Sequence, residues 1–358
     1  MINFKFLSFL IFFLLIFIFG FKLLFFFLFI LFIFFYKHKK SYYLLLIAYI
    51  FLSFLIFDII APKLDNFKND YLIESSFEYE INPYYGYYPK KNSILKDKIF
   101  KKGVLQSEII YTINKFGHRK SYTVKNNLNR CVVFYGGSII FGQSVNDEES
   151  LSYKIFEKSN KKLSTFNFAF NGYGPHQFLS KLENNFTKQL RSCKKIDFIY
   201  LYIDDHIGRI AGKRSWGDQS PRYVVNDHGV IQKKFFSHYP YKIIMKFRKH
   251  MRNSKTFSLI YDVDKVSMHD QVLFTEIINS IEDKINLKFN NSNFLYLVWD
   301  KKKNHNLLVK KFLKNKQFLE IENLNIPDEY QNNKIPGDYH PTKEFYDILS
   351  DYILDLIL

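Results

Sequence analysis

Two segments of the sequence carry the residue types that acyl transfer requires. Ser138 follows two glycines in YGGSIIFG, and Asp338 and His340 stand two positions apart in PGDYHPTKEF. A serine becomes a nucleophile when a histidine accepts its proton, and a carboxylate fixes the imidazole tautomer and stabilises the imidazolium. The residue types therefore indicate Ser138 as nucleophile, His340 as base and Asp338 as the carboxylate. For the glycine turn alone, a purely structural role is the alternative.

A third segment, NFAFNGYGPHQ, combines closely spaced glycines with polar side chains. Gly172 and Gly174 allow the backbone to approach a ligand closely, and Asn171 or His176 could point toward it. A turn that only ends a strand is the alternative here. The glycines before Ser138 do not form a phosphate-binding loop, because no GKS or GKT sequence follows them.

From Arg130 onward, short apolar runs alternate with longer helical stretches, which predicts an α/β fold with a parallel sheet. Loops at the carboxyl ends of parallel strands converge on the ligand. The segments with Ser138 and Gly172 follow the first two expected strands, and the Asp338/His340 pair precedes the last helix, so these segments are expected to meet. The expected strands are residues 131–135, 164–170, 197–203, 294–299 and 318–323, and the last helix is residues 341–357.

These segments, in this order, resemble the SGNH or GDSL-type hydrolases over roughly residues 130–358. The resemblance implies a flavodoxin-like three-layer sandwich with a five-stranded parallel sheet in strand order 2-1-3-4-5. It implies that Ser138 is the nucleophile and that the backbone N–H groups of Ser138 and Gly172 form the oxyanion hole. It also implies that Asp338 and His340 are the acid and the base. The upstream segment INKFGHRK resembles one that often precedes the nucleophile block in membrane-anchored bacterial members.

The segment after the third expected strand, the family's third sequence block, departs from the family pattern. Members of the family usually have an asparagine followed by an aspartate there, whereas this sequence has Asp204, Asp205 and His206. An ionised carboxylate in the asparagine's position cannot donate a hydrogen bond and would repel an oxyanion. Three outcomes are open: a neutral Asp204, a substituted donor such as His206 or Asn171, or an inactive site. A substituted donor is favoured, because His206 or Arg209 could donate the hydrogen bond to the oxyanion that the missing asparagine would have donated.

The first sixty residues predict a membrane anchor of two or three transmembrane helices. An apolar run of residues 4–35 and a second of residues 42–60 flank a basic segment, residues 37–40. A span needs about 20 apolar residues, and no small-residue cleavage site of a signal peptide follows either run. The positive-inside rule places the basic segment in the cytoplasm. The sequence therefore predicts a multi-pass membrane protein whose catalytic domain is extracytoplasmic.

The rest of the chain is expected to divide into a connecting region, residues 61–127, and an SGNH hydrolase-like domain, residues 128–358, with an insertion at about 207–254. The net charge of +17 does not indicate nucleic acid, because the lysines are scattered among Asn, Phe and Tyr. Cys131 and Cys193 lack metal-binding spacing, so no metal or other cofactor is expected. A disulfide between them and two separate buried thiols both remain open.

The sequence thus favours serine-dependent ester hydrolysis or O-acyl transfer on an acylated carbohydrate or lipid of the cell envelope. The membrane is the other expected partner. The alternative is a catalytically impaired module of the same fold that binds glycan or assists envelope assembly. The missing asparagine of the third block is the observation that supports this alternative.

Overall fold

The computed structural model describes residues 21–39, 42–67, 70–124, 128–214, 217–299, 316–331, 338 and 340–358. These residues form two compact units. The helical unit comprises the described residues up to Asp70 together with Ser237–Lys265, and the sheet unit comprises those of Tyr71–Phe236 and Val266–Leu358. A segment from the middle of the chain therefore belongs to the same unit as the N-terminal helices.

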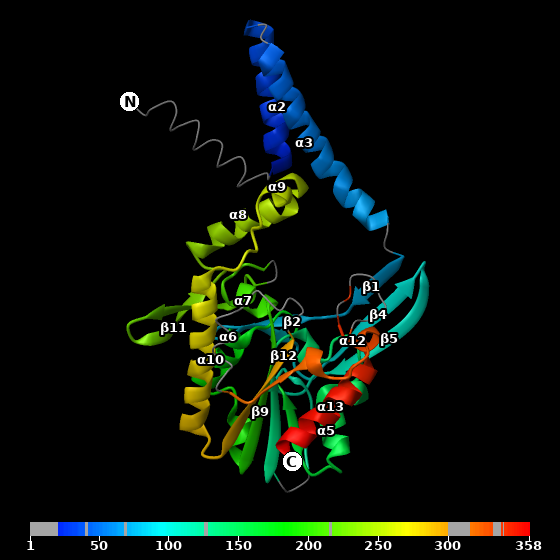
Figure 1. The fold of residues 1–358 in the computed structure, drawn as a ribbon, viewed down its shortest axis with the longest axis vertical. Helices are drawn as coiled ribbons and strands as arrows, with labels where there is room; N and C mark the ends of the chain where they lie inside the picture. The colour runs from blue at the N-terminus through cyan, green and yellow to red at the C-terminus, as the bar shows by residue number, and fades with distance from the viewer. Residues whose placement is uncertain are drawn as a thin grey trace. The chain divides into compact units, whose positions relative to one another are not determined.

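The sheet unit is built on a six-stranded sheet with strand order β13-β12-β9-β7-β8-β6. Its strands β9 and β12 are labelled in Figure 1. Neighbouring strands from β13 to β8 run parallel, and β6 pairs antiparallel with β8 at the edge. The predicted parallel sheet of an α/β fold is confirmed, with one antiparallel strand added. The strands are β6 (Arg119–Tyr122), β7 (Arg130–Tyr135), β8 (Ser164–Asn167), β9 (Lys195–Ile203), β12 (Ser292–Trp299) and β13 (Phe318–Glu320).

Hydrophobic cores lie on both faces of this sheet. Val132 and Phe134 of β7 face the core that helices α5 and α13 cover, whereas Val133 and Tyr135 face the core that α6 and α10 cover (Figure 1). Because β7 is buried on both faces, its sequence reads as a continuous apolar run. The helices of this unit are α4 (Ser138–Phe141), α5 (Leu151–Lys158), α6 (Pro175–Glu183), α7 (Asp205–Ile210), α10 (Met268–Lys288), α12 (Asp328–Gln331) and α13 (Lys343–Ile357).

Additional antiparallel strands precede and interrupt the α/β core. A hairpin of β2 and β3 docks on the loop after β8, where the Tyr87 hydroxyl donates to the Asn171 carbonyl at 2.8 Å. The Tyr173 hydroxyl returns a hydrogen bond to the Tyr87 carbonyl at 2.5 Å. These strands are β1 (Tyr71–Ser75), β2 (Tyr79–Asn82), β3 (Gly86–Pro89), β4 (Ile94–Lys101), β5 (Val104–Thr112), β10 (Pro221–Asn226) and β11 (Gly229–Phe235).

The helical unit contains α2 (Phe21–Lys39), α3 (Tyr42–Phe67), α8 (Tyr241–Asn253) and α9 (Lys255–Ile260). Among the described residues, one segment, Leu45–Pro62 of α3, is long and apolar enough to cross a membrane. The apolar part of α2, Leu28–Lys37, is shorter. The predicted anchor of two or three spans and the multi-pass topology are therefore not supported. Residues 1–20, which carry part of that prediction, lie outside the described residues.

A disulfide joins the starts of two neighbouring strands. Cys131 at the beginning of β7 is bonded to Cys193 just before β9, and their Cα atoms are 5.9 Å apart. Of the two alternatives that the sequence left open, the structure has the disulfide rather than two separate thiols.

Candidate active site

Ser138 begins the short helix α4, three residues after β7 ends. Two glycines form this turn, and both are needed. Gly136 has φ +146°, which side chains rarely allow, and a Cβ on Gly137 would lie 2.5 Å from a guanidinium nitrogen of Arg209. As the first residue of α4, Ser138 has a backbone N–H without an intrahelical acceptor. No other described group accepts from it, so this N–H is available to a ligand.

Ser138 lines an open cavity of about 880 Å³ in the sheet unit. Five of the predicted site residues line it together: Ser138, Gly172, Asp205, Asp338 and His340. Asp204 and His206 do not line it. The hairpin β2–β3, the loop after β8, helix α7 and the segment before β10 supply further walls, among them Tyr79, Tyr87, Asn171, Arg209, Asp218 and Gln219.

Asp338 holds the His340 ring in a defined orientation. One carboxylate oxygen of Asp338 is hydrogen-bonded to His340 Nδ1 and also accepts the His340 backbone N–H at 3.0 Å. The other oxygen accepts from the Ser144 hydroxyl at 2.9 Å. Burial raises the pKa of Asp338, but these hydrogen bonds and the His340 charge outweigh it and hold the pKa below its ordinary value. With Nδ1 engaged, Nε2 is the ring atom left to exchange a proton.

The loop after β8 offers a backbone hydrogen-bond donor, the Gly172 N–H, on the same cavity. Gly172 has φ +76°, a left-handed conformation that favours glycine. No described group accepts from its backbone N–H. Next to it, Asn171 Oδ1 is buried without a partner among the described residues.

The end of β9 places Asp205 rather than Asp204 on the cavity. The Asp204 carboxylate accepts from the Tyr202 hydroxyl at 2.8 Å and lies outside the cavity lining. Asp205 accepts from Arg209 Nε at 2.7 Å and from Arg214 Nε. Burial raises the pKa of Asp205, but the two guanidinium charges and their hydrogen bonds outweigh it and hold the pKa below its ordinary value. Asp205 is therefore ionised and paired at neutral pH.

Of the donors considered from the sequence, His206 is buried and does not reach the cavity. Its Nδ1 pairs with the Tyr200 hydroxyl at 2.7 Å. Burial, and then the Arg209 charge, lower the pKa of His206 well below its ordinary value. The neighbouring His176 is buried as well, and the same two causes lower its pKa to about 3. Both rings are neutral, so the cationic group that lines the cavity here is Arg209.

Arg209 is fixed by the loops that it joins. Its Nη1 donates to the Tyr173 carbonyl at 2.6 Å, and its Nε donates to Asp205. The same guanidinium lies directly beneath the Gly137 turn. One side chain from α7 therefore bonds to the loops after β8 and β9 and lies close to the turn after β7.

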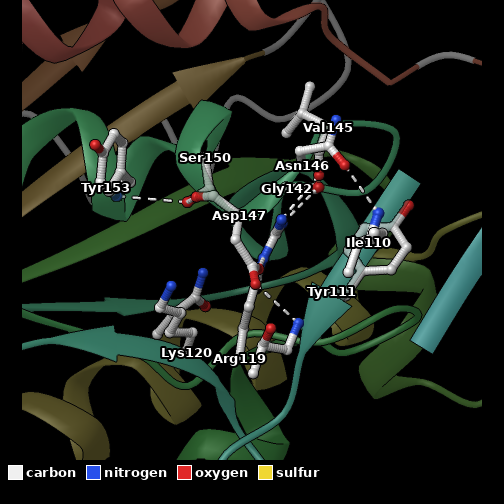
Figure 2. A network of polar contacts seen from close by, with 12 residues as sticks. Ile110, Tyr111, Arg119, Lys120, Gly142, Val145, Asn146, Asp147, Ser150 and Tyr153 are labelled. Carbon is white, nitrogen blue, oxygen red and sulfur yellow. Dashed lines mark hydrogen bonds and ion pairs between the residues drawn. The ribbon is translucent and has the colours of Figure 1, made fainter. Parts of the chain in front are cut away.

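A second arginine holds the loop that follows Ser138 (Figure 2). Arg119 Nη1 donates to the carbonyls of Phe141 and Gly142, each at 2.6 Å, and Nη2 donates to the Val145 carbonyl at 2.8 Å. Its Nε pairs with Asp147 at 3.0 Å. These carbonyls belong to the last turn of α4 and the residues after it, where intrahelical donors are lacking and a cation is favourable.

The partner of this arginine is itself buried and fixed. Asp147 Oδ2 accepts the Thr112 backbone N–H at 3.0 Å, and the Asp147 carbonyl accepts from the Tyr122 hydroxyl at 2.8 Å. The Arg119 and Asp147 side chains are 1% and 6% exposed, so this ion pair is almost fully desolvated. The sequence marked the INKFGHRK segment but not the role of Arg119. The only sequence signal of this role was the presence of an arginine, Arg119, near the end of that segment.

Among the described residues, no group of three or more His, Cys, Asp or Glu side chains is placed to hold a metal ion. The chemistry available in the cavity is that of a serine hydroxyl, an imidazole with its carboxylate, backbone N–H groups and a guanidinium.

No protein family and no curated protein matches this chain. Among solved structures, the psychrotrophic esterase EstA from Pseudoalteromonas sp. is 10% identical, with a TM-score of 0.33 over 63% of this chain and 94% of that one. An acetyl xylan esterase from the rumen bacterium Butyrivibrio proteoclasticus is 8% identical, with a TM-score of 0.38 over 81% and 87%. A further carbohydrate esterase is 7% identical, with a TM-score of 0.34 over 81% and 97%. Similarity at this level assigns neither family nor function.

Proposed function

We propose that the sheet unit is a serine esterase that hydrolyses acyl esters. One observation carries the proposal: Ser138, Gly172 and the hydrogen-bonded Asp338/His340 pair come from distant parts of the sequence and line one cavity. A nucleophile, an oriented base and free backbone donors are the set of groups that acyl transfer needs.

In the proposed reaction, Ser138 Oγ attacks the ester carbonyl carbon while His340 Nε2 takes the hydroxyl proton. The N–H groups of Ser138 and Gly172 donate to the oxyanion that forms. The intermediate collapses, the bond to the alcohol breaks, and the alcohol leaves with the proton from His340. Water then attacks the acyl-serine in the same way, which releases the carboxylic acid and restores Ser138. If a sugar hydroxyl replaces the water, the same steps give O-acyl transfer.

The walls of the cavity favour an acylated carbohydrate as the substrate. Tyr79 and Tyr87 supply aromatic rings with polar ends, and Asp218 and Gln219 supply hydrogen-bonding groups. Apolar surface with a few placed polar groups is the usual composition of a small-molecule site. A cell-envelope glycan or lipid that carries an ester fits this chemistry.

We further propose that the protein is anchored in a membrane with the sheet unit outside the cytoplasm. Three observations support this: the apolar segment Leu45–Pro62, the basic residues 37–40 before it, and the Cys131–Cys193 disulfide. Mass spectrometry of the exported protein under non-reducing conditions tests the last point. Two alkylatable thiols would contradict an oxidising compartment.

The alternative function is a binding module without activity, and its support in the sequence is an aspartate in the place of the family's asparagine. Asp204 lies outside the cavity, and the aspartate that lines it, Asp205, is neutralised by two arginines. A repelled oxyanion is therefore no longer a reason to prefer this alternative.

Labelling with a fluorophosphonate tests the esterase proposal. The full-length protein in detergent should form an adduct at Ser138, and Ser138→Ala should abolish both the adduct and the hydrolysis of p-nitrophenyl acetate. Ser258→Ala, at an exposed serine of the helical unit, is the matched control and should leave both unchanged. Folded protein without an adduct at Ser138 would favour the binding module.

A further inference from the structure

The segment 237–265, which interrupts the sheet unit, is bound to the apolar helix α3 through a buried carboxylate. Asp58 lies within the candidate span and is fully buried. It accepts from the Ser254 hydroxyl and the Thr256 backbone N–H, each at 2.7 Å. A carboxylate in an apolar span is costly unless it is partnered. These bonds therefore fix the junction of α8 and α9 at the level of Asp58, four residues before the span ends.

Apolar contacts extend this attachment. Phe247 and Met251 of α8 and Phe257 of α9 pack on a cluster formed by α2 and α3. The cluster members from α2 and α3 are Phe25, Leu28, Phe51, Phe54 and Leu55. The contact lies on the half of α3 that leads to Asp58, so α8 and α9 belong to one end of the apolar helices.

Helix α8 has two chemically different faces. Helical spacing places Ile243, Ile244, Phe247 and Met251 along one stripe, and the first two are 45% and 39% exposed. The opposite face carries the exposed lysines Lys242, Lys246 and Lys249. Residues 241–260 hold six Lys or Arg residues and no Asp or Glu. The apolar stripe thus begins on the α2–α3 cluster and continues beyond it.

We propose that α8 lies in the outer surface layer of an anionic membrane, a proposal that rests on the membrane anchor proposed above. Ile243 and Ile244 enter the boundary between headgroups and acyl chains, and the lysines of the opposite face attract anionic headgroups. The apolar stripe of α8 is continuous with α3. Only 11% of the apolar segment Leu45–Pro62 of α3 is buried within the protein, so most of its apolar surface is available to contact lipid acyl chains. The attraction of these basic residues to an anionic surface is weakened by salt.

Two single-cysteine labels on the full-length protein test this placement. The native cysteines are disulfide-bonded, so Ile244→Cys and, as the matched control, Lys249→Cys can each be labelled with an environment-sensitive fluorophore. The protein is reconstituted into vesicles of phosphatidylcholine with or without about a third phosphatidylglycerol. We expect blue-shifted emission and quenching by spin-labelled lipid at position 244, increased by phosphatidylglycerol and reduced by salt, and a water-like signal at position 249.

The charge dependence is tested by Lys242→Glu and Lys246→Glu together, read out with the label at position 244. The quenching gained from phosphatidylglycerol should be lost, while attachment through Asp58 remains. A water-like signal at position 244 in both kinds of vesicle would overturn the proposal and leave the apolar stripe to a protein partner. Equal quenching in both kinds of vesicle would overturn the role of the anionic headgroups. Neither readout depends on esterase activity, so these outcomes are separate from those for Ser138.

Discussion

At the end of β9, a difference of one position decides which carboxylate faces the cavity. The sequence resemblance placed Asp204 where it would oppose an oxyanion, but its partner is the Tyr202 hydroxyl. Asp205 faces the cavity and is held by Arg209 and Arg214. Sequence reasoning could not distinguish the two, because the side-chain directions depend on where the strand ends and α7 begins, and such boundaries are uncertain by one or two residues.

This difference leads to a paired prediction. Asp205→Asn removes the charge that orients Arg209, so kcat/KM for p-nitrophenyl acetate should fall about 10-fold to 100-fold, the effect of 1.4 to 2.7 kcal/mol. Asp204→Asn is the matched control and should change the rate less than about threefold, because its carboxylate lies outside the cavity. A large gain in rate with Asp204→Asn would show instead that its charge acts on the oxyanion.

The Asp338/His340 pair gives a second prediction at this scale. Asp338→Asn keeps the shape of the side chain but no longer fixes the Nδ1 tautomer, so under the proposed function kcat should fall by roughly 10³-fold to 10⁴-fold, the effect of this change in established serine triads. Ser144→Ala removes one hydrogen bond to Asp338 and should lower kcat only about 2-fold to 10-fold. Steady-state kinetics of the two variants measure both effects. A wild-type rate for Asp338→Asn would exclude this carboxylate from catalysis.

Among the elements, α4 is too short to hold Ser138 without support. Arg119, from β6, binds the carbonyl of the last α4 residue, Phe141, and those of Gly142 and Val145 after the helix (Figure 2). The guanidinium also lies 5.0 Å from the centre of the Tyr111 ring and 5.3 Å from that of Phe141. In the proposed reaction Arg119 is a positioning residue, because it contacts the loop that carries Ser138 and does not line the cavity itself.

Arg119→Lys is therefore expected to reduce both stability and turnover. A lysine keeps the charge but cannot reach all three carbonyls and Asp147 from one planar group. The free energy of unfolding should fall by about 3 kcal/mol, as for a disrupted buried ion pair, and in folded protein kcat should fall while KM stays the same. Thermal melting and steady-state kinetics measure the two effects.

The neighbouring Lys120→Met is the control for this change. Lys120 forms an exposed pair with Glu148 at 3.3 Å, which is worth at most about 1 kcal/mol. The Lys120→Met substitution should therefore leave kcat unchanged and change the melting temperature very little. Full turnover in folded Arg119→Lys protein would mean that Arg119 stabilises the fold without positioning Ser138.

Whether an element could be predicted from the sequence depends on whether its burial leaves a pattern in its own residues. Strands such as β7 could be recognised because burial on both faces gives them unbroken apolar sequences. The turn before Ser138 could be recognised because both positions require glycine: Gly136 for its φ of +146°, and Gly137 because a Cβ would collide with Arg209. The hairpin β2–β3, which brings Tyr79 and Tyr87 to the cavity, could not, because its place depends on contacts with residues more than eighty positions away.

For the whole molecule, the sequence predicted an apolar anchor and an α/β unit but not which segments pack together. The amphipathic pattern of α8 shows that one face is covered and does not show by what. Its attachment to α3 depends on the bond between Asp58 and Ser254, which are 196 positions apart. Such a contact leaves no periodic signal in either segment.

The buried bases of the sheet unit determine how its stability depends on pH. Lys181 is 1% exposed, and burial lowers its pKa to about 7. Its ammonium lies 4.9 Å from the centre of the Tyr85 ring and 5.0 Å from that of Tyr173, contacts that favour the charged form and moderate the cost of burial. Burial also lowers the pKa of His118 well below its ordinary value. In both cases the unfolded chain binds the proton more tightly than the folded chain.

Stability should therefore rise with pH through the range set by these groups. Between pH 7 and about 10 the unfolded chain keeps the Lys181 proton that the folded chain loses, so the free energy of unfolding should increase by up to about 1.4 kcal/mol per pH unit. Below about pH 6.5, the buried His118, His176 and His206 also bind protons more tightly in the unfolded chain, so the free energy of unfolding falls further as the pH drops. Chemical denaturation between pH 5 and pH 9 measures the slope, and Lys181→Met should flatten it above pH 7 while the decrease in stability at acid pH, which comes from the buried histidines, remains. An unchanged slope in Lys181→Met would show that the ring contacts keep Lys181 charged in the folded protein and that another group titrates.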